Sequence, residues 1–170
     1  AKKAILFVGS SSFTMWKDVQ KYFPSHTIIN RGFGGSSLPD VIRYADDIVL
    51  PYHAKQIVIY CGENDFAGSD TVTAQLVFAR FKQLFSIIRD HYVKVKITYV
   101  SMKPSPSRVR LMPKMQEANL LIKNFLRKKK KTSFVDVYYS MLEADGKPIE
   151  SIFLADKLHM DANGYAIWQK

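Results

Sequence analysis

The hydrophobic residues of this chain fall into short runs that are separated by longer stretches with helical periodicity. Five of the short runs are rich in β-branched and aromatic residues. We expect a strand at each of them, at residues 4–9, 27–30, 56–61, 95–101 and 133–137. The first and third runs are almost continuously hydrophobic, which is typical of parallel strands that are covered on both faces.

Between these runs, apolar residues recur at the spacing of an amphipathic helix. We expect helices at 71–92 and 113–130, where the pattern is clearest, and at 14–22, 39–49 and 162–169. Strands that alternate with helices indicate βαβ units with right-handed crossovers. The pattern therefore predicts an α/β fold, a three-layer α/β/α sandwich around a five-stranded parallel sheet.

The size of the chain, 170 residues, is that of one domain, and no linker or repeat divides it. We therefore expect residues 1–170 to form a single domain. The one cysteine, Cys61, excludes an intrachain disulfide and a cysteine-based zinc site. No apolar run is long enough to span a membrane. The chain begins at Ala1 and not at Met, so the sequence leaves open whether it is cytoplasmic or exported after removal of a signal.

The formal net charge of +10 is concentrated in one segment. Residues 80–131 contain fifteen Lys and Arg residues but only two acids, Asp90 and Glu117, so this segment carries +13 and the rest of the chain −3. Solvated helix faces explain such a segment most simply, and binding of an anionic glycan, a lipid headgroup or nucleic acid is the alternative. Because no nucleic-acid-binding motif accompanies the charge, we expect no nucleic-acid partner.

The carboxyl ends of the strands are where an open parallel sheet places its working site. Polar or glycine-rich segments follow three of the predicted strands, and a fourth such segment lies near the C-terminus. These candidates for chemistry are residues 9–12, 30–36, 62–65 and 156–159.

The first two segments are suited to a negative charge that forms during a reaction. Three serines, Ser10 to Ser12, stand between a strand and a helix, where free backbone N–H groups and the helix dipole favour an anion. Glycines at 32–35 let backbone N–H groups approach an anion closely, although they match neither a dinucleotide fingerprint nor a Walker loop. A helix cap and a tight turn are the structural alternatives.

The other two segments supply a side-chain donor and a base. Asn64 offers an amide of the kind found in oxyanion holes, and an Asx turn is its structural alternative. Asp156 precedes His159 by three residues, which places a carboxylate beside an imidazole; a surface ion pair is the alternative. The remaining histidines have no acid at such a spacing and are predicted to be structural: His26, His53 and His91.

The four segments, in this order, resemble the sequence blocks of the SGNH hydrolases, also called GDSL esterases. Residues 7–12 resemble the nucleophile block and residues 30–36 the glycine block. Residues 62–65 read G-E-N-D and match the G-x-N-D block, while residues 156–159 read D-K-L-H and match the D-x-x-H block. The resemblance extends over nearly the whole chain and implies the flavodoxin-like fold of that family.

The resemblance also implies roles for five residues, position by position. Ser11 is the nucleophile, His159 the general base and Asp156 its partner. The backbone N–H groups of Ser11 and Gly35, together with the side chain of Asn64, form the oxyanion hole.

Two positions in these blocks leave alternatives. The acid that usually precedes the nucleophile is Ser10 here, so Ser10 and Ser12 are alternative nucleophiles, although we favour Ser11. Gly34 is the alternative to Gly35, which we favour because it immediately precedes the short polar residue Ser36.

The resemblance implies a serine esterase of the platelet-activating-factor acetylhydrolase or carbohydrate-esterase kind, which needs neither a metal nor an organic cofactor. The chain has no long insertion able to form a lid or a deep tunnel, so we expect a short acyl group, first of all acetyl. The substrate alcohol is left open between a small molecule, a glycan and a lipid, and the oligomeric state is not indicated. The alternative function is a non-catalytic module that binds an anionic polymer through residues 80–131.

Overall fold

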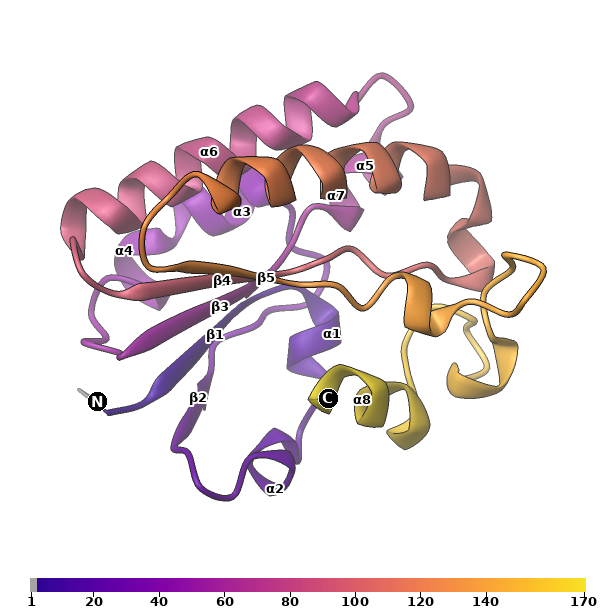
Figure 1. Cartoon of the computed structure of the whole chain (residues 1–170), viewed down its shortest axis with the longest axis horizontal. Helices are drawn as coiled ribbons and strands as arrows, with labels where there is room; N and C mark the ends of the chain where they lie inside the picture. Colours follow the sequence, from indigo (N-terminus) through magenta and orange to yellow (C-terminus); the bar gives the residue numbers. More distant parts are fainter. Residues whose placement is uncertain (1–2) are drawn as a thin grey trace.

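Five parallel strands form one sheet in the computed structural model, which describes residues 3–170 (Figure 1). The predicted domain also includes Ala1 and Lys2, which lie outside the described residues. The sheet has the order β2-β1-β3-β4-β5. Its strands are β1 (Ile5–Gly9), β2 (Ile28–Asn30), β3 (Gln56–Tyr60), β4 (Lys96–Val100) and β5 (Thr132–Val135). The α/β class and the five predicted strands are therefore confirmed, with ends that shift by one or two residues.

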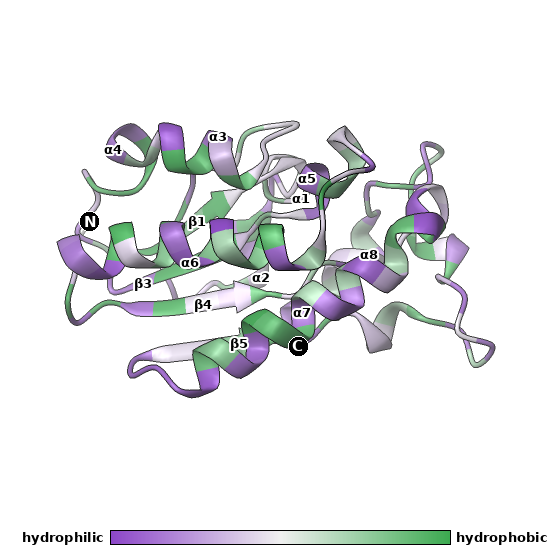
Figure 2. Ribbon diagram, turned by 90° about the horizontal axis from the view of Figure 1, so that it is seen from above, coloured by the Kyte–Doolittle hydropathy of each residue, from purple (hydrophilic) through white to green (hydrophobic). Residues whose placement is uncertain are grey.

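Two groups of helices cover the two faces of this sheet (Figures 1 and 2). The first face carries α3 (Leu38–Arg43), α4 (Ala45–Ile48), α6 (Ala74–His91) and α7 (Met112–Arg127). The second face carries α1 (Ser11–Thr14), α2 (Val19–Tyr22) and α8 (Ala162–Gln169). The short helix α5 (Glu63–Gly68) follows β3 directly. Short 3-10 helices occupy Pro106–Leu111, Tyr139–Met141 and Glu150–Ile152.

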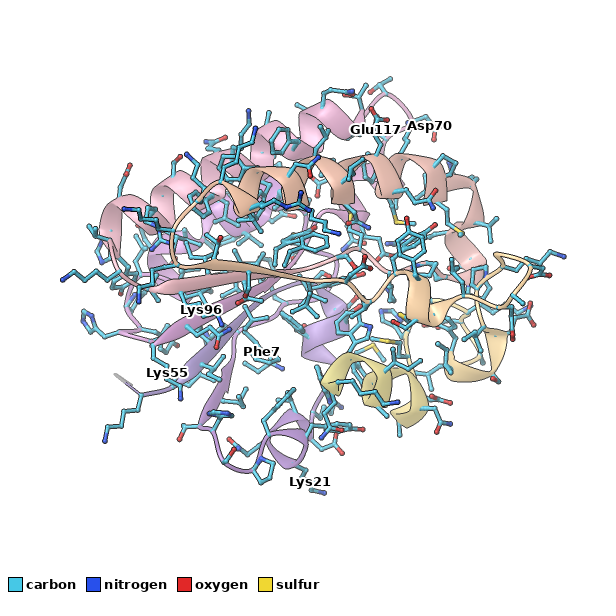
Figure 3. All side chains as sticks on the ribbon, in the orientation of Figure 1. Phe7, Lys21, Lys55, Asp70, Lys96 and Glu117 are labelled. Carbon is cyan, nitrogen blue, oxygen red and sulfur yellow. The ribbon has the colours of Figure 1, made fainter. Side chains whose placement is uncertain are left out.

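The continuous hydrophobicity of the strands reflects burial on both sides of the sheet. Leu6 and Val8 of β1 belong to the core under α3, α6 and α7. Phe7, between them, packs instead against Phe13 and Trp16 on the second face, below the sheet in Figure 3. Because successive side chains of a strand point to opposite faces, each must be apolar when both faces are covered.

The second face is covered less completely than the first. An apolar groove of about 290 Å³ remains beside α8, lined among others by Phe7, Val58 and Trp168. Polar side chains also lie on this face, because Gln56 Nε2 donates to Thr98 Oγ1 over 2.8 Å and Thr98 Oγ1 lies 2.7 Å from Ser133 Oγ. The three-layer arrangement is present, but its second helical layer is short.

The predicted helix at 14–22 is wrong in its extent. The chain instead forms two single turns, α1 and α2, with Trp16 between them. Trp16 is buried and stacks on Tyr165, with ring centroids 4.7 Å apart. The break in the helix lets this large side chain enter the second core, which the apolar spacing alone does not reveal.

The predicted helix at 39–49 also divides, at Tyr44. Tyr44 has non-helical backbone angles (φ −100°, ψ 12°), and α4 follows it. Ser37 begins α3 with a capping box in which its side chain and that of Asp40 bond reciprocally to the backbone.

The two long helices are shorter than the periodicity predicts. Helix α6 begins after Thr73, whose side chain accepts a hydrogen bond from the Leu76 N–H group over 3.1 Å and so caps the helix. Helix α7 ends at Arg127, and Lys131 adopts a positive φ of 56° as the chain turns into β5. The sequence interpretation missed α5, because its first turn was taken for a loop.

Part of the positive charge of residues 80–131 is engaged in hydrogen bonds and ion pairs within the chain. Arg89, for example, donates to backbone carbonyls just before β4 and just before β5. One of them is the carbonyl of Val95, at 2.7 Å. At least six of the fifteen cations donate to a carboxylate or a backbone carbonyl of the chain: Arg80, Arg89, Lys103, Arg108, Arg110 and Lys114. Among the helices of residues 3–170, none is both long and apolar enough to cross a membrane.

Candidate active site

The sheet topology brings two of the predicted segments together. Strands β1 and β3 are neighbours, with Gly9 paired to Tyr60 at their carboxyl ends. From β1 the chain adds β2 on one side, and it then crosses over to add β3 on the other side. Such a switch point opens a crevice outside the carboxyl ends of the strands. Ser11 follows β1 and Asn64 follows β3 at this edge.

Gly9 gives the end of β1 a backbone geometry that a side chain would prevent. Its φ is +144°, and an added Cβ atom would lie 1.8 Å from the carbonyl oxygen of Tyr60. The Gly9 carbonyl accepts hydrogen bonds from the Phe33 N–H group over 2.8 Å and from Ser36 Oγ over 3.0 Å. The strand end that precedes Ser11 is thus fixed to the glycine block.

Three of the predicted site residues form a continuous hydrogen-bonded chain. Ser11 Oγ lies 2.8 Å from His159 Nε2, and His159 Nδ1 lies 2.5 Å from Asp156 Oδ2. A proton on Nδ1, facing the carboxylate, leaves Nε2 free to accept the Ser11 proton. The arrangement therefore places a hydroxyl, an imidazole and a carboxylate in line, the order that a nucleophile, a base and an orienting acid would need.

The Asp156 carboxylate is held by backbone groups as well as by the imidazole. Its Oδ1 atom accepts the N–H groups of Leu158 and His159, each over 2.9 Å. Slight burial opposes ionisation, but these hydrogen bonds and the one from the His159 ring lower the pKa of Asp156 from 3.8 to about 2. Asp156 is thus a carboxylate throughout the neutral range, although nearly half of its side chain is exposed.

The structure distinguishes the members of the serine triplet by their surroundings. Ser11 is the first residue of α1, and its side chain reaches His159. Ser10 and Ser12 are buried, and within residues 3–170 their hydroxyl groups make no hydrogen bond. Of the three, only Ser11 is placed to transfer a proton to the imidazole.

The predicted oxyanion donors lie on three adjoining elements. Within the described part of the chain, the backbone N–H groups of Ser11 and Gly35 have no hydrogen-bond partner. Gly35 is exposed and has a φ of +72°, whereas Gly34 has no left-handed conformation. Asn64 Nδ2 donates to the carbonyl of Ser36, the residue after Gly35, over 3.0 Å. The amide nitrogen of Asn64 has a second hydrogen that this bond does not use.

A buried ionic cluster behind Asn64 escaped the sequence interpretation. Glu63 is only 3% exposed. Its carboxylate forms ion pairs with Lys103 Nζ at 3.0 Å and Arg108 Nη1 at 2.9 Å, and it accepts a hydrogen bond from the hydroxyl of Tyr60. Burial raises the pKa of Glu63, but the charges of Lys103 and Arg108 outweigh it and lower the pKa below its usual value. One signal was present in the sequence, namely a lysine two residues after the predicted strand at 95–101.

This cluster leads to a stability prediction for Glu63→Gln. The variant leaves the Lys103 ammonium buried without a carboxylate in contact, so we expect a loss of about 3–5 kcal/mol in the free energy of unfolding. Lys103 would then fold as the neutral amine while it is protonated in the unfolded chain, so stability should increase as the pH is raised from 7 toward 10. Thermal or urea unfolding at several pH values measures both effects.

Asp70→Asn is the matched control for that variant. It removes the carboxylate of an exposed ion pair, Arg110 to Asp70 at 3.0 Å, and should change stability by less than about 1 kcal/mol. Equal effects of the two substitutions would contradict a structural role for the buried pair.

No metal site accompanies this arrangement in residues 3–170, where no three His, Cys, Asp or Glu side chains gather as potential ligands. Both ring nitrogens of His159 already have hydrogen-bond partners, Asp156 Oδ2 and Ser11 Oγ.

Comparisons with known proteins identify the family of the chain. The family model described as GDSL-like lipase/acylhydrolase matches residues 8–167. A comparison with curated protein sequences finds no match.

Solved structures give the same picture of the fold. A GDSL-like lipase from Bacteroides thetaiotaomicron has a TM-score of 0.84 at 22% identity, over 99% of this chain and 84% of that one. A carbohydrate esterase family 3 protein from Talaromyces cellulolyticus has a TM-score of 0.74 at 12% identity, over 98% and 92% of the two chains. An acetyl-xylooligosaccharide esterase from Geobacillus has a TM-score of 0.75 at 16% identity, over 98% and 90%.

Proposed function

The chain belongs to the GDSL-like lipase/acylhydrolase family and is a hydrolase of the esterase type, and we propose that it cleaves short-chain esters, acetyl esters first of all, through an acyl-enzyme on Ser11. The observation that carries the proposal is the hydrogen-bonded chain from Ser11 Oγ through His159 to Asp156. The partly free donors at Ser11, Gly35 and Asn64 support it, because the reaction needs N–H groups for an oxyanion.

The proposed reaction has two halves that use the same residues. Ser11 Oγ attacks the ester carbonyl carbon while His159 Nε2 takes the hydroxyl proton, and the N–H groups of Ser11, Gly35 and Asn64 hold the resulting oxyanion. The carbon–oxygen bond to the alcohol then breaks, and the proton on His159 passes to the departing alcohol. Water repeats the sequence on the acyl-enzyme, releasing the carboxylic acid and restoring the serine.

The preference for a short acyl group rests on the openness of the site. Gly34 and Gly35 are exposed, and Ser11 and His159 are both partly exposed, so the reacting hydroxyl lies close to solvent. Such a site offers a long acyl chain little apolar surface to bury. Two of the similar solved structures are described as an acetyl esterase and an acetyl-xylooligosaccharide esterase, which favours acetyl and leaves a glycan among the possible alcohols.

A non-catalytic binding module on residues 80–131 has less support. At least six of the cations in that segment have partners within the molecule. A purely binding role would also leave the alignment of Ser11 with His159 unexplained.

An acyl-chain series together with covalent labelling tests the proposal. We expect kcat/KM for p-nitrophenyl esters to fall from acetate to butyrate to octanoate. A fluorophosphonate should add one phosphonyl group to the protein, and peptide mass spectrometry should place it on Ser11. A preference for octanoate would contradict the short acyl group. Hydrolysis without labelling, or labelling at another residue, would contradict the serine mechanism.

A further inference from the structure

The side chain of Asn64 is held at both ends of its amide group. Its Nδ2 atom donates one hydrogen to the carbonyl of Ser36 over 3.0 Å. Its Oδ1 atom accepts a hydrogen bond from Arg108 Nη2, also over 3.0 Å. Because the oxygen has a cationic donor and one N–H has an acceptor, the amide has a single orientation, with its other N–H as the remaining free donor.

Arg108 is itself held by the buried cluster. Its Nη1 atom lies 2.9 Å from Glu63 Oε1, and the other carboxylate oxygen of Glu63 is occupied by Lys103 Nζ and the Tyr60 hydroxyl. The guanidinium therefore bridges Glu63 and the amide of Asn64 with two parallel donors, a geometry that lysine cannot reproduce. The Arg108 side chain is 17% exposed, so little of its orientation depends on solvent.

The backbone around Arg108 is also joined to the segment that carries the base. Arg108 departs from helical geometry within its 3-10 turn (φ −121°, ψ 28°). The neighbouring Ser107 donates its N–H group to the carbonyl of Lys157 over 3.0 Å, and Lys157 lies between Asp156 and His159. One short turn thus contacts both the proposed oxyanion donor and the D-x-x-H segment.

We propose that Arg108 is a positioning residue for the reaction: held by Glu63, whose carboxylate Lys103 also binds, it fixes the Asn64 amide so that the free N–H group points at the oxyanion. This inference rests on the proposed function, since Asn64 matters for rate only if an oxyanion forms. Removing an oxyanion donor costs a factor of about 10²–10³ in kcat. Loosening a donor that stays in place should cost less, and we expect Arg108→Met to lower kcat about 10- to 100-fold with KM little changed.

A double-mutant cycle separates positioning from other roles. If Arg108 acts through Asn64, Arg108→Met should lower kcat less than about twofold in an Asn64→Ala background. Arg108→Lys should retain intermediate activity, because it keeps the charge but cannot form both bonds. Arg110→Met is the matched control, two residues away, where an exposed ion pair to Asp70 is lost, and its kcat should equal that of the wild type.

A spectroscopic readout keeps the test independent of catalysis. The side-chain NH₂ signals of Asn64, assigned by their loss in Asn64→Ala, should move in Arg108→Met and not in Arg110→Met. Arg108→Lys serves for both readouts if Arg108→Met does not fold. Equal losses of kcat from Arg108→Met with and without Asn64, or unmoved amide signals, would overturn the proposal. Activity retained in Ser11→Ala would overturn the proposed function and not the role of Arg108. The side-chain NH₂ signals of Asn64 would still test the hydrogen bond from Arg108 to Asn64 in that case.

Discussion

Replacing Ser11 by alanine should lower kcat by a factor of about 10⁶, the loss that removal of the nucleophile causes in serine hydrolases. The hydroxyl lies 2.8 Å from His159 Nε2, and alanine leaves no atom there to attack the substrate. The oxyanion donors remain in the variant, so its rate should still exceed that of water alone. Hydrolysis of p-nitrophenyl acetate under saturating conditions measures the effect.

Ser10→Ala and Ser12→Ala are the controls that the serine triplet offers. Ser10 is the N-cap residue of α1, but its side chain makes no capping hydrogen bond, so its loss should change stability little. The carbonyl of Ser12, and not its hydroxyl, accepts the hydrogen bond from Tyr165 over 2.7 Å. Both variants should keep kcat within a few-fold of the wild type. If either lost activity as Ser11→Ala does, or if Ser11→Ala kept more than about a tenth of it, the nucleophile would lie elsewhere in the triplet.

Asp156→Asn should lower kcat by a factor of about 10⁴ while leaving the fold intact. The two backbone N–H groups that bond to Oδ1 require an oxygen there, so the new amide nitrogen would occupy the place of Oδ2, next to His159 Nδ1. Nδ1 must then accept a hydrogen bond, and the ring proton moves to Nε2. That tautomer cannot take the proton of Ser11. Kinetic assays measure the loss.

Asp161→Asn is the matched control for this substitution. Asp161 begins α8, where its side chain accepts the N–H groups of Asn163 and Gly164, and asparagine caps helices about as well. Its kcat should remain at the level of the wild type. A kcat of Asp156→Asn within tenfold of the wild type would contradict the orienting role of this carboxylate.

The acid side of the stability curve should also change in Asp156→Asn. The pKa of Asp156 is lowered from 3.8 to about 2, so the folded state binds its proton more weakly than the unfolded state does. The stabilisation is complete above about pH 4 and is lost as the pH falls through about 2. Thermal melts between pH 5 and 2 should show a shallower decline in the variant, and identical curves would contradict this assignment.

The strand pattern was enough to predict the α/β class and the five strands, and the four polar segments indicated where the candidate site lies; the choice of Ser11 and Gly35 within those segments rested on the family resemblance. Burial on both faces forces nearly every residue of β1 and β3 to be apolar, which leaves a clear signal in the sequence. The helix divided by Trp16 was not predictable, because its break serves a packing contact with Tyr165 that is remote in sequence. The start of α5 was missed because Asn and Asp are also typical of turns.

The sequence by itself determined the chemistry available to this protein, because it places serine, glycine, asparagine, aspartate and histidine in the four polar segments. Only the tertiary structure decided which serine is hydrogen-bonded to His159. The three adjacent hydroxyl groups differ only in the direction in which the end of β1 points them. The tertiary structure alone joined Arg108 to Asn64 and Glu63, more than forty residues away, across the ends of β3 and β4. Such a contact depends on strand order, and no local pattern of hydrophobic and polar residues encodes the distance between two loops.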